Sequence, residues 1–357
     1  MRIYVTHMCP KDKLMEYGLS LSASNFNYNL IAGRGFDKVF SIYPGFIKGE
    51  LDKPDDETFE AVYSDWRKKG YIRQRLARFV EQYRVFKLIP KKSNVWFYNV
   101  TTINVLTIFL LKIFRPSCSL NIIELDYAPD ETFHKLMLPI INSMNGRICL
   151  STYERFNKEN SVCLPGVIPN CSSKNNPRVH TVTKDVLISG ALKENITMLG
   201  MVLDAFAEMP DINLHISGVL IDFKDKIEEY SKKYPNIHFY GKLPIDKYQA
   251  LLQRVPISLN TRKPSAIENR CNFPSKVIEA FCYNRIVAST IHYPQLDGLR
   301  YFELGSNKDT FIKSIRNIFS MSNDELLKYA NQGELAEQMY SANRWFSIMD
   351  KIEKHEI

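Results

Sequence analysis

A stretch of nine residues, 272–280, combines side chains that suit the binding of a phosphate and a sugar alcohol; it reads NFPSKVIEA. Pro274 suits the first turn of a helix, because its missing N–H would have no partner there. Ser275 and Lys276 then lie beside the unpaired backbone donors of a helix N-terminus, where phosphate binds readily. Glu279 follows Ser275 by four residues, so its carboxylate is predicted on the same side of the helix, where it can accept hydrogen bonds from ribose hydroxyls. An ordinary capped helix with a solvated lysine and glutamate is the alternative.

Two apolar runs, Val255–Leu259 and Arg285–Ser289, flank this segment and predict strands late in an alternating α/β pattern. In that context the FPSKxxE motif of residues 273–279 resembles the donor-site helix of the GT-B nucleotide-sugar glycosyltransferases. The branch it is most similar to is glycosyltransferase family 4, the group 1 enzymes of bacterial polysaccharide synthesis. The resemblance implies an α/β fold of the GT-B type, with two Rossmann-like α/β domains facing across a cleft and a C-terminal helix that crosses back to the first domain.

The same resemblance assigns roles to the motif residues. Ser275 and Lys276 take the donor diphosphate, and Glu279 takes the ribose. The chain departs from the family eight positions before that glutamate, where many members have an acid that touches the donor sugar and this chain has Cys271. Glu268 is the nearest acid upstream, so the donor sugar is not readable from the motif.

The second half of the chain opens with the strand candidate Val186–Gly190 and a helix after it, the unit that places backbone amides under a phosphate. This opening resembles the family's GxLxxxK motif. Ala191 replaces the arginine that often follows the glycine, which leaves Lys193 as the cation; a plain surface lysine is the alternative. The next strand candidate ends at Gly218.

Two further segments complete the predicted donor side. In the resembling enzymes the backbone after the third strand reads the nucleotide base, which here indicates residues 240–242. The loop 261–270 carries three cations, and Arg262 lies nearest to the preceding strand, so a diphosphate leaving group can be stabilised there without a metal. A solvated charged loop is the alternative.

The first half offers fewer signals. The strand candidate Leu120–Asp126 delivers Asp126 at its C-terminal end, where ligands collect in open α/β sheets, so Asp126 is a candidate base for an acceptor hydroxyl. A helix-capping aspartate is the alternative. The loop from His7 to Gly18 resembles the acceptor-facing loop of the same enzymes, although a plain strand-to-helix turn fits it equally.

These signals define the predicted site. The donor-binding residues are Gly190, Lys193, Gly218, Tyr240, Gly241, Lys242, Asn260, Phe273, Pro274, Ser275 and Glu279. The catalytic residues are Asp126, Arg262 and Lys276, and the acceptor-binding residues are Gly18, Ser22 and Asn25. No D-x-D carboxylate pair, P-loop or G-x-G-x-x-G fingerprint occurs, and the resemblance implies no metal or other cofactor.

Length and composition bound these expectations. A chain of 357 residues with 45% hydrophobic and 24% charged residues predicts two globular domains. The polar segment 170–185 separates an N-terminal acceptor-binding domain, 1–172 plus about 338–357, from a donor-binding domain, 184–337. A net charge of +8 favours nucleotide diphosphates, nucleic acid or an anionic membrane as partners, without choosing among them.

The sequence also predicts a cellular location. Seven scattered cysteines without a C-x-x-C pair indicate a reducing cytoplasm, and the N-terminus predicts a first strand rather than a signal peptide. The apolar run Val105–Phe114 and a basic cluster within 67–78 suit peripheral contact with an anionic membrane at the inner face of the cell membrane. A buried Rossmann helix beside a solvated basic face is the alternative.

The predicted function is transfer of a sugar from a UDP- or GDP-sugar to a glycan or lipid-linked glycan in bacterial surface polysaccharide synthesis. The resemblance implies retention of configuration, whereas deprotonation by Asp126 from the opposite face would give inversion. A non-catalytic GT-B-like subunit and a nucleic-acid-binding protein are the alternatives. No recognised nucleic-acid-binding module supports the second, so nucleic acid is not an expected partner.

Overall fold

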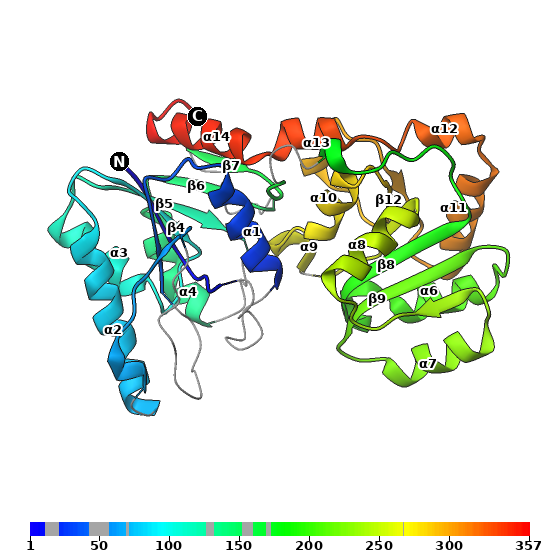
Figure 1. Cartoon of the computed structure of the whole chain (residues 1–357), viewed down its shortest axis with the longest axis horizontal. Coiled ribbons are helices and arrows are strands. Elements are labelled where there is room, and N and C mark those ends of the chain that lie inside the picture. Colours follow the sequence, from blue (N-terminus) through cyan, green and yellow to red (C-terminus); the bar gives the residue numbers. More distant parts are fainter. Residues whose placement is uncertain are drawn as a thin grey trace. The chain divides into compact units, whose positions relative to one another are not determined.

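Two parallel sheets organise the chain, and the computed structural model describes residues 1–10, 21–42, 57–68, 71–125, 132–151, 160–168, 173–266 and 268–357 (Figure 1). The sheets belong to two units. Unit 1 comprises Met1–Asn170, Cys271–Phe273 and Tyr340–Ile357, and unit 2 comprises Cys171–Arg270 and Pro274–Met339.

The sheet of unit 1 has the order β3-β2-β1-β4-β5-β6-β7, and every neighbouring pair is parallel. Its strands are β1 Arg2–Thr6, β2 Lys38–Ser41, β3 Glu60–Ala61, β4 Asn94–Tyr98, β5 Ser119–Glu124, β6 Gly146–Cys149 and β7 Ser161–Cys163. The order reverses between β1 and β4. In doubly wound sheets such a switch point is where ligands bind, outside the carboxyl ends of the strands.

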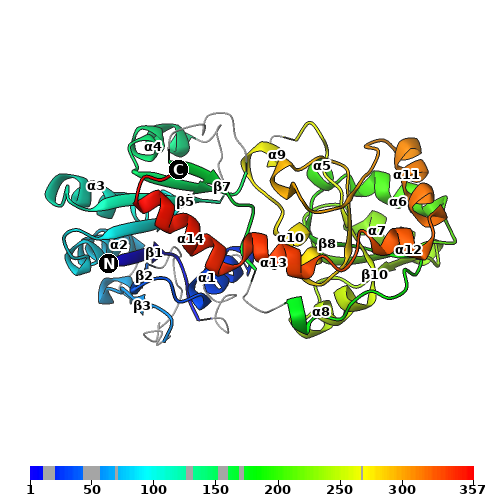
Figure 2. The ribbon, with the colours of Figure 1, turned by 90° about the horizontal axis from the view of Figure 1, so that it is seen from above.

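Helices cover both faces of this sheet. They are α1 Leu21–Ala32, α2 Tyr71–Leu88, α3 Val105–Phe114, α4 Thr132–Asn142 and α14 Ala342–Glu353, with the short 3₁₀ helix η2 at Asp65–Lys68. Val85 of α2 and Leu111 of α3 share a buried core with Ile3 and Val5 of β1. On the other face α14 contacts α1, and Figure 2 shows α14 running across the strands there.

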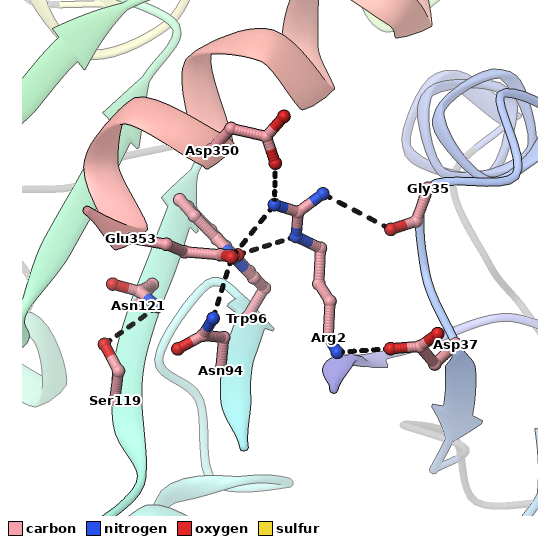
Figure 3. A network of polar contacts seen from close by, with 9 residues as sticks. All are labelled: Arg2, Gly35, Asp37, Asn94, Trp96, Ser119, Asn121, Asp350 and Glu353. Carbon is pink, nitrogen blue, oxygen red and sulfur yellow. Dashed lines mark hydrogen bonds and ion pairs between the residues drawn. The ribbon is translucent and has the colours of Figure 1, made fainter. Parts of the chain in front are cut away.

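A partly buried polar network fastens the C-terminal helix to this unit (Figure 3). The guanidinium of Arg2 donates to Glu353 at 2.6 and 2.9 Å and also contacts Asp350. Glu353 accepts two further hydrogen bonds, from Trp96 Nε1 at 2.8 Å and from Asn94 Nδ2 at 2.7 Å. Residues 340–357 thus return to the first unit, as the predicted fold required.

The sheet of unit 2 has the order β10-β9-β8-β11-β12-β13, again parallel throughout. Its strands are β8 Asp185–Leu192, β9 Asn213–Leu220, β10 Ile237–Phe239, β11 Ile257–Asn260, β12 Ile286–Ser289 and β13 Phe302–Glu303. Its helices are α5 Glu194–Thr197, α6 Leu199–Ala207, α7 Lys224–Lys233, α8 Ile245–Arg254, α9 Glu268–Cys271, α10 Ser275–Cys282, α11 Lys308–Ser320, α12 Asn323–Leu327 and α13 Gly333–Tyr340.

Alternation along β8 distributes these helices over two faces. Val186 and Ile188 join a core with Phe206 of α6 and Phe311 of α11. Leu187 points to the other face and packs with Leu251 of α8. Side chains of opposite parity along one parallel strand therefore feed two cores, which confirms the α/β class.

One predicted helix boundary is wrong, because Pro274 is the N-cap residue of α10 with extended backbone and not part of its first turn. At the end of the chain, Ser341 separates α13 from α14. Its backbone is extended and its hydroxyl accepts from the N–H of Arg344, so α14 begins as a newly capped helix.

Among the described residues, no helix combines the length and the apolar character needed to cross a membrane. Five described cysteines take part in no disulfide bond: Cys9, Cys118, Cys149, Cys163 and Cys282.

Candidate functional site

The switch point of unit 2 lies between β8 and β11, and two glycines shape its edge. Gly190 and Gly218 face each other in the β8–β9 register. A Cβ on Gly218 would lie 1.9 Å from the carbonyl oxygen of Gly190, and the backbone φ angles of Gly218 and Gly190 are +149° and +126°. Only glycine tolerates both conditions, so the pair leaves the backbone bare of side chains near the carboxyl ends of β8 and β9. The two strands were predicted to end at these glycines, but they continue to Leu192 and Leu220.

Beside this bare edge stands a polar cluster, which we call the Lys276 cluster and define as Ser189, Tyr248, Lys276 and Glu279. The Lys276 ammonium donates to Tyr248 Oη and to Glu279 Oε2, both at 3.1 Å. Tyr248 Oη donates to the same Glu279 oxygen at 2.9 Å and lies 3.2 Å from Ser189 Oγ. The Lys276 stem passes 3.7 Å from the Cβ position of Gly190, so helix α10 and strand β8 meet at this cluster.

Charges in the Lys276 cluster are fixed by their surroundings. Burial and then the Glu279 carboxylate raise the pKa of Tyr248 to about 12, so its hydroxyl stays neutral. Burial alone would lower the pKa of Lys276, but Glu279 and Tyr248 outweigh it and raise that pKa. The lysine is therefore a permanent cation, and its side chain is 38% exposed. An ammonium has three donors, and the contacts within the described residues use two of them.

The end of β11 supplies the other side of the switch point. Asn260 Nδ2 donates to Tyr293 Oη at 2.7 Å and to Ser289 Oγ at 3.1 Å, which holds the strand end rigid. Arg262 follows two residues later and is half-buried. Its backbone N–H donates to Thr290 Oγ1 at 2.7 Å, and that hydroxyl donates to the Arg262 carbonyl at 2.7 Å. The backbone of Arg262 is thus held at the carboxyl edge of the sheet, and its role toward a diphosphate stays a prediction.

The remaining donor residues differ in exposure. Ser275 is exposed as the first residue of α10, whereas Phe273 is only 5% exposed and belongs to the packed interior. Lys193 precedes α5 as its N-cap residue, half-buried and with extended backbone. None of the contacts described for the Lys276 cluster involves Lys193.

The segment predicted to read the base extends beyond β10. The Gly241 carbonyl accepts from Gly218 N–H at 2.9 Å, which ties it to the glycine edge, while Lys242 is exposed. Tyr240 Oη lies 2.8 Å from His215 Nδ1, and His215 Nε2 lies 3.0 Å from Asp185. Burial lowers the pKa of His215 despite that aspartate, so the Tyr240 hydroxyl is held by a neutral imidazole.

The predicted acceptor side falls mostly outside the described residues. Asp126 and Gly18 lie there, and Ser22 is described only as a member of α1. Asn25 is exposed on α1. The roles of these four residues stay predictions.

Sequence reasoning missed polar residues at the carboxyl edge of the sheet of unit 1. His7 directly follows β1, and its Nε2 lies 3.2 Å from Thr101 Oγ1 in the loop after β4. Burial lowers the pKa of His7 to about 4, so it is neutral. Glu124 ends β5 at 5% exposure, and burial raises its pKa to about 7. The position of His7 at a strand end was a readable signal, whereas the burial of Glu124 was not.

Tyr248, the centre of the Lys276 cluster, was missed as well. It lies within the amphipathic helix α8 without any motif around it. Its role comes only from the packing of α8 beside α10.

The described residues also contain no group of three or more His, Cys, Asp or Glu side chains placed to hold a metal ion.

No protein-family model and no curated protein matches the sequence. Several solved structures are similar to the chain. The chain is similar to the N-terminal domain of trehalose-6-phosphate phosphatase of Candida albicans at 12% identity and a TM-score of 0.71, over 100% of this chain and 97% of that one. It is similar to the UDP-forming α,α-trehalose-phosphate synthase of Burkholderia vietnamiensis at 7% identity and a TM-score of 0.66, over 99% of both chains. It is also similar to HepE of Anabaena, solved with UDP and glucose, at 13% identity and a TM-score of 0.62, over 99% of this chain and 98% of that one.

The chain has the GT-B fold. Coverage of nearly the whole of each chain means that the likeness includes both parallel sheets and the returning C-terminal helix. The predicted fold is thereby confirmed. The GT-B fold also gives the Lys276 cluster its context, because it lies at the carboxyl edge of the second of the two sheets.

Proposed function

We propose that this protein is a glycosyltransferase that moves a sugar from a UDP-sugar to a glycan or lipid-linked glycan acceptor. The observation that carries the proposal is the Lys276 cluster beside the bare Gly190–Gly218 edge. The Lys276 cation, the N-terminus of α10 and a backbone without side chains at the two glycines lie together there. This combination suits the binding of a diphosphate. Two of the similar structures are described with UDP, as a UDP-forming synthase and as a complex with UDP and glucose.

The proposed chemistry needs no metal, because cations of the chain stabilise the leaving group. Lys276, Ser275 and the N-terminus of α10 hold the diphosphate, and Arg262 adds a second cation. Glu279 accepts hydrogen bonds from the ribose, which leaves Lys276 to turn from Glu279 to phosphate oxygen. The bond between the anomeric carbon and the phosphate oxygen breaks, and the acceptor oxygen forms a new bond to that carbon.

We propose retention, with the acceptor hydroxyl entering on the side of the departing diphosphate and passing its proton to a phosphate oxygen. The stereochemistry is testable by NMR of the product's anomeric centre. Synthesis of a bacterial surface polysaccharide, with a lipid-linked acceptor at the inner face of the cell membrane, is the setting that we propose for this reaction.

A thermal-shift panel of UDP, GDP, CDP and their sugars tests the donor. We expect UDP and a UDP-sugar to raise the melting temperature more than the other nucleotides. Lys276→Ala is expected to raise the donor KM and lower kcat, because it removes the cation from both bound states. Lys184→Ala is the matched control, since Lys184 pairs with Asp211 on the surface just before β8. Equal kinetics for Lys276→Ala and wild type contradict the proposal, and UDP binding without transfer or hydrolysis identifies a non-catalytic subunit.

A further inference from the structure

Helix α2 carries apolar side chains on the side that faces away from its own unit. Ile72, Leu76, Phe79 and Tyr83 follow one another at intervals of four, three and four residues, so they form one stripe along the helix. They are 73%, 45%, 56% and 48% exposed. Large apolar residues occur singly on many surfaces, but a continuous helical stripe of them does not arise by chance placement.

The stripe is not needed for the fold. The opposite side of α2 packs on the sheet through Ala77, Glu81 and Val85, all fully buried. A surface helix needs only that one apolar side to bind its domain. The second apolar side is therefore available to a binding partner.

Helix α3 extends the same surface. It contacts α2, and Figures 1 and 2 show the two helices side by side. Phe109, Ile113 and Phe114 of α3 are 55%, 52% and 63% exposed. The Phe114 ring lies 6.3 Å from that of Phe86, a buried residue of α2, so the exposed end of α3 packs against α2. We call the apolar surface of the two helices the outer surface and define it as Ile72, Leu76, Phe79, Tyr83, Phe109, Ile113 and Phe114.

Helices α2 and α3 also carry many cations. The cations of α2 and α3 and the residue after α3 are Arg73, Arg75, Arg78, Arg84, Lys87, Lys112 and Arg115. At 100° per residue, Arg73 and Arg84 fall on one side of the stripe and Arg75 on the other. Glu81 is the one acidic residue in either helix, and it is buried, where its Oε1 accepts from the N–H of Ser64. The rim is therefore cationic without a compensating carboxylate on these helices.

An apolar stripe with arginines along both sides matches an anionic lipid surface. Apolar side chains enter the level of the headgroups, while arginine stems lie along them and the guanidinium groups reach phosphate. A second copy of this chain fits less well, because a symmetric contact through the outer surface would set arginines against arginines. The charge pattern thus favours lipid over self-association.

The direction of α2 connects this surface to the acceptor edge. Helix α2 leads into β4 through Ile89–Ser93, so it runs antiparallel to the strands and begins near their carboxyl ends. Those ends carry His7 and Thr101 at the switch point of unit 1. A bilayer on the outer surface would consequently lie next to the edge where an acceptor is expected.

We propose that the outer surface of α2 and α3 docks on an anionic lipid bilayer. The inference deepens the proposed function, on which it rests for the identity of a lipid-linked acceptor. Docking itself requires neither donor nor acceptor.

Co-sedimentation of the full chain with vesicles tests the proposal. We expect binding to vesicles of phosphatidylglycerol and phosphatidylcholine in equal parts, weak binding to phosphatidylcholine alone, and weakening with added salt. The double variant Ile72→Ser with Phe79→Ser should bind at least about tenfold more weakly. Arg73→Gln with Arg75→Gln should bind roughly thirtyfold more weakly, at about 1 kcal/mol for each cation near the surface.

Matched variants of unit 2 distinguish docking through the outer surface from non-specific binding to vesicles. Ile221→Ser with Ile245→Ser removes two side chains that are 59% and 54% exposed, and Lys232→Gln with Lys233→Gln removes two exposed cations. Both should bind vesicles as the wild type does. Equal loss in these controls, or no binding to anionic vesicles, overturns the proposal. So does a dimer in sedimentation velocity that the Ile72 and Phe79 changes dissociate without any effect on vesicles.

UDP binding, measured on the same variants, distinguishes the two proposals. Outer-surface variants should bind UDP normally. Vesicle binding without UDP binding would refute the proposed function and leave docking standing.

Discussion

Removal of the Tyr248 hydroxyl tests whether the Lys276 cluster holds its cation in a binding geometry. Tyr248→Phe keeps the ring, which lies 4.3 Å from the Lys276 ammonium, and so keeps the packing of a side chain that is 8% exposed. What it removes is an acceptor for Lys276 and a donor to Glu279. Lys276 and Glu279 would remain in contact at 3.1 Å, but their side chains would lose the hydroxyl that fixes their orientation.

The magnitude follows from the exposure of the two charged partners. A hydrogen bond to a charged group contributes roughly 1.5 to 3 kcal/mol. The side chains of Lys276 and Glu279 are 38% and 31% exposed, so water replaces part of the loss and the lower value applies. We therefore expect about 1.5 kcal/mol, or roughly tenfold weaker UDP binding. In turnover with a UDP-sugar, the effect should appear mainly in the donor KM.

Calorimetric titration with UDP measures this effect, and Tyr230→Phe provides the control. The Tyr230 hydroxyl donates to Asp204 at 2.5 Å between α6 and α7, on the other face of the same sheet, and its pKa is likewise raised to about 12. That variant loses one charged hydrogen bond without touching the Lys276 cluster. An unchanged UDP Kd for Tyr248→Phe, or an equal loss for Tyr230→Phe, would refute the reasoning.

Two further predictions concern unit 1. Glu353→Ala should lower the free energy of unfolding by about 3 kcal/mol, because it breaks an ion pair whose side chains are only 13% and 11% exposed and leaves the side-chain donors of Trp96 and Asn94 without their acceptor. Chemical denaturation measures this free energy. The control Glu334→Ala, from a pair whose side chains are 59% and 61% exposed, should change it by less than about 1 kcal/mol. Glu124→Gln should stabilise the protein at pH 8 and not at pH 4. Burial raises the pKa of Glu124 from 4.5 to about 7, so between these two pH values the native state binds a proton that the unfolded state releases. The free energy of unfolding of the wild type therefore falls as the pH rises from 4.5 to about 7. The interval corresponds to about 3 kcal/mol, and a stability difference between variant and wild type that does not change from pH 4 to pH 8 would contradict it.

Local signals made most of the fold predictable. An apolar run predicts strand β8, and a helix-start pattern predicts helix α10. The alternation of such strands and helices along the chain implies parallel sheets. The positive φ angles of Gly190 and Gly218 fit the glycines that the pattern singled out. These features depend on neighbours in the chain, which is why a single sequence reveals them.

Features that depend on packing were not predictable. Tyr248 joins the Lys276 cluster because α8 packs beside α10, and the two lie some twenty residues apart with no shared motif. The break at Ser341 was not predicted, because it depends on the Ser341 hydroxyl, which accepts from the N–H of Arg344 and caps α14. The outward stripe of α2 was likewise hidden, since periodicity does not tell which of two apolar sides faces the core.

The carboxyl edges of the two sheets differ in electrostatics, and the difference suits the two substrates of the sugar transfer that we propose. At the carboxyl edge of unit 2, Glu279 and Tyr248 raise the pKa of Lys276, so a positive charge persists where a diphosphate would bind. At the carboxyl edge of unit 1, burial lowers the pKa of His7 to about 4 and raises that of Glu124 to about 7, so burial there disfavours charge. A neutral imidazole can accept a hydrogen bond from a sugar hydroxyl without first releasing a proton. The charged donor and the neutral acceptor would thus each meet the edge whose polarity matches its own.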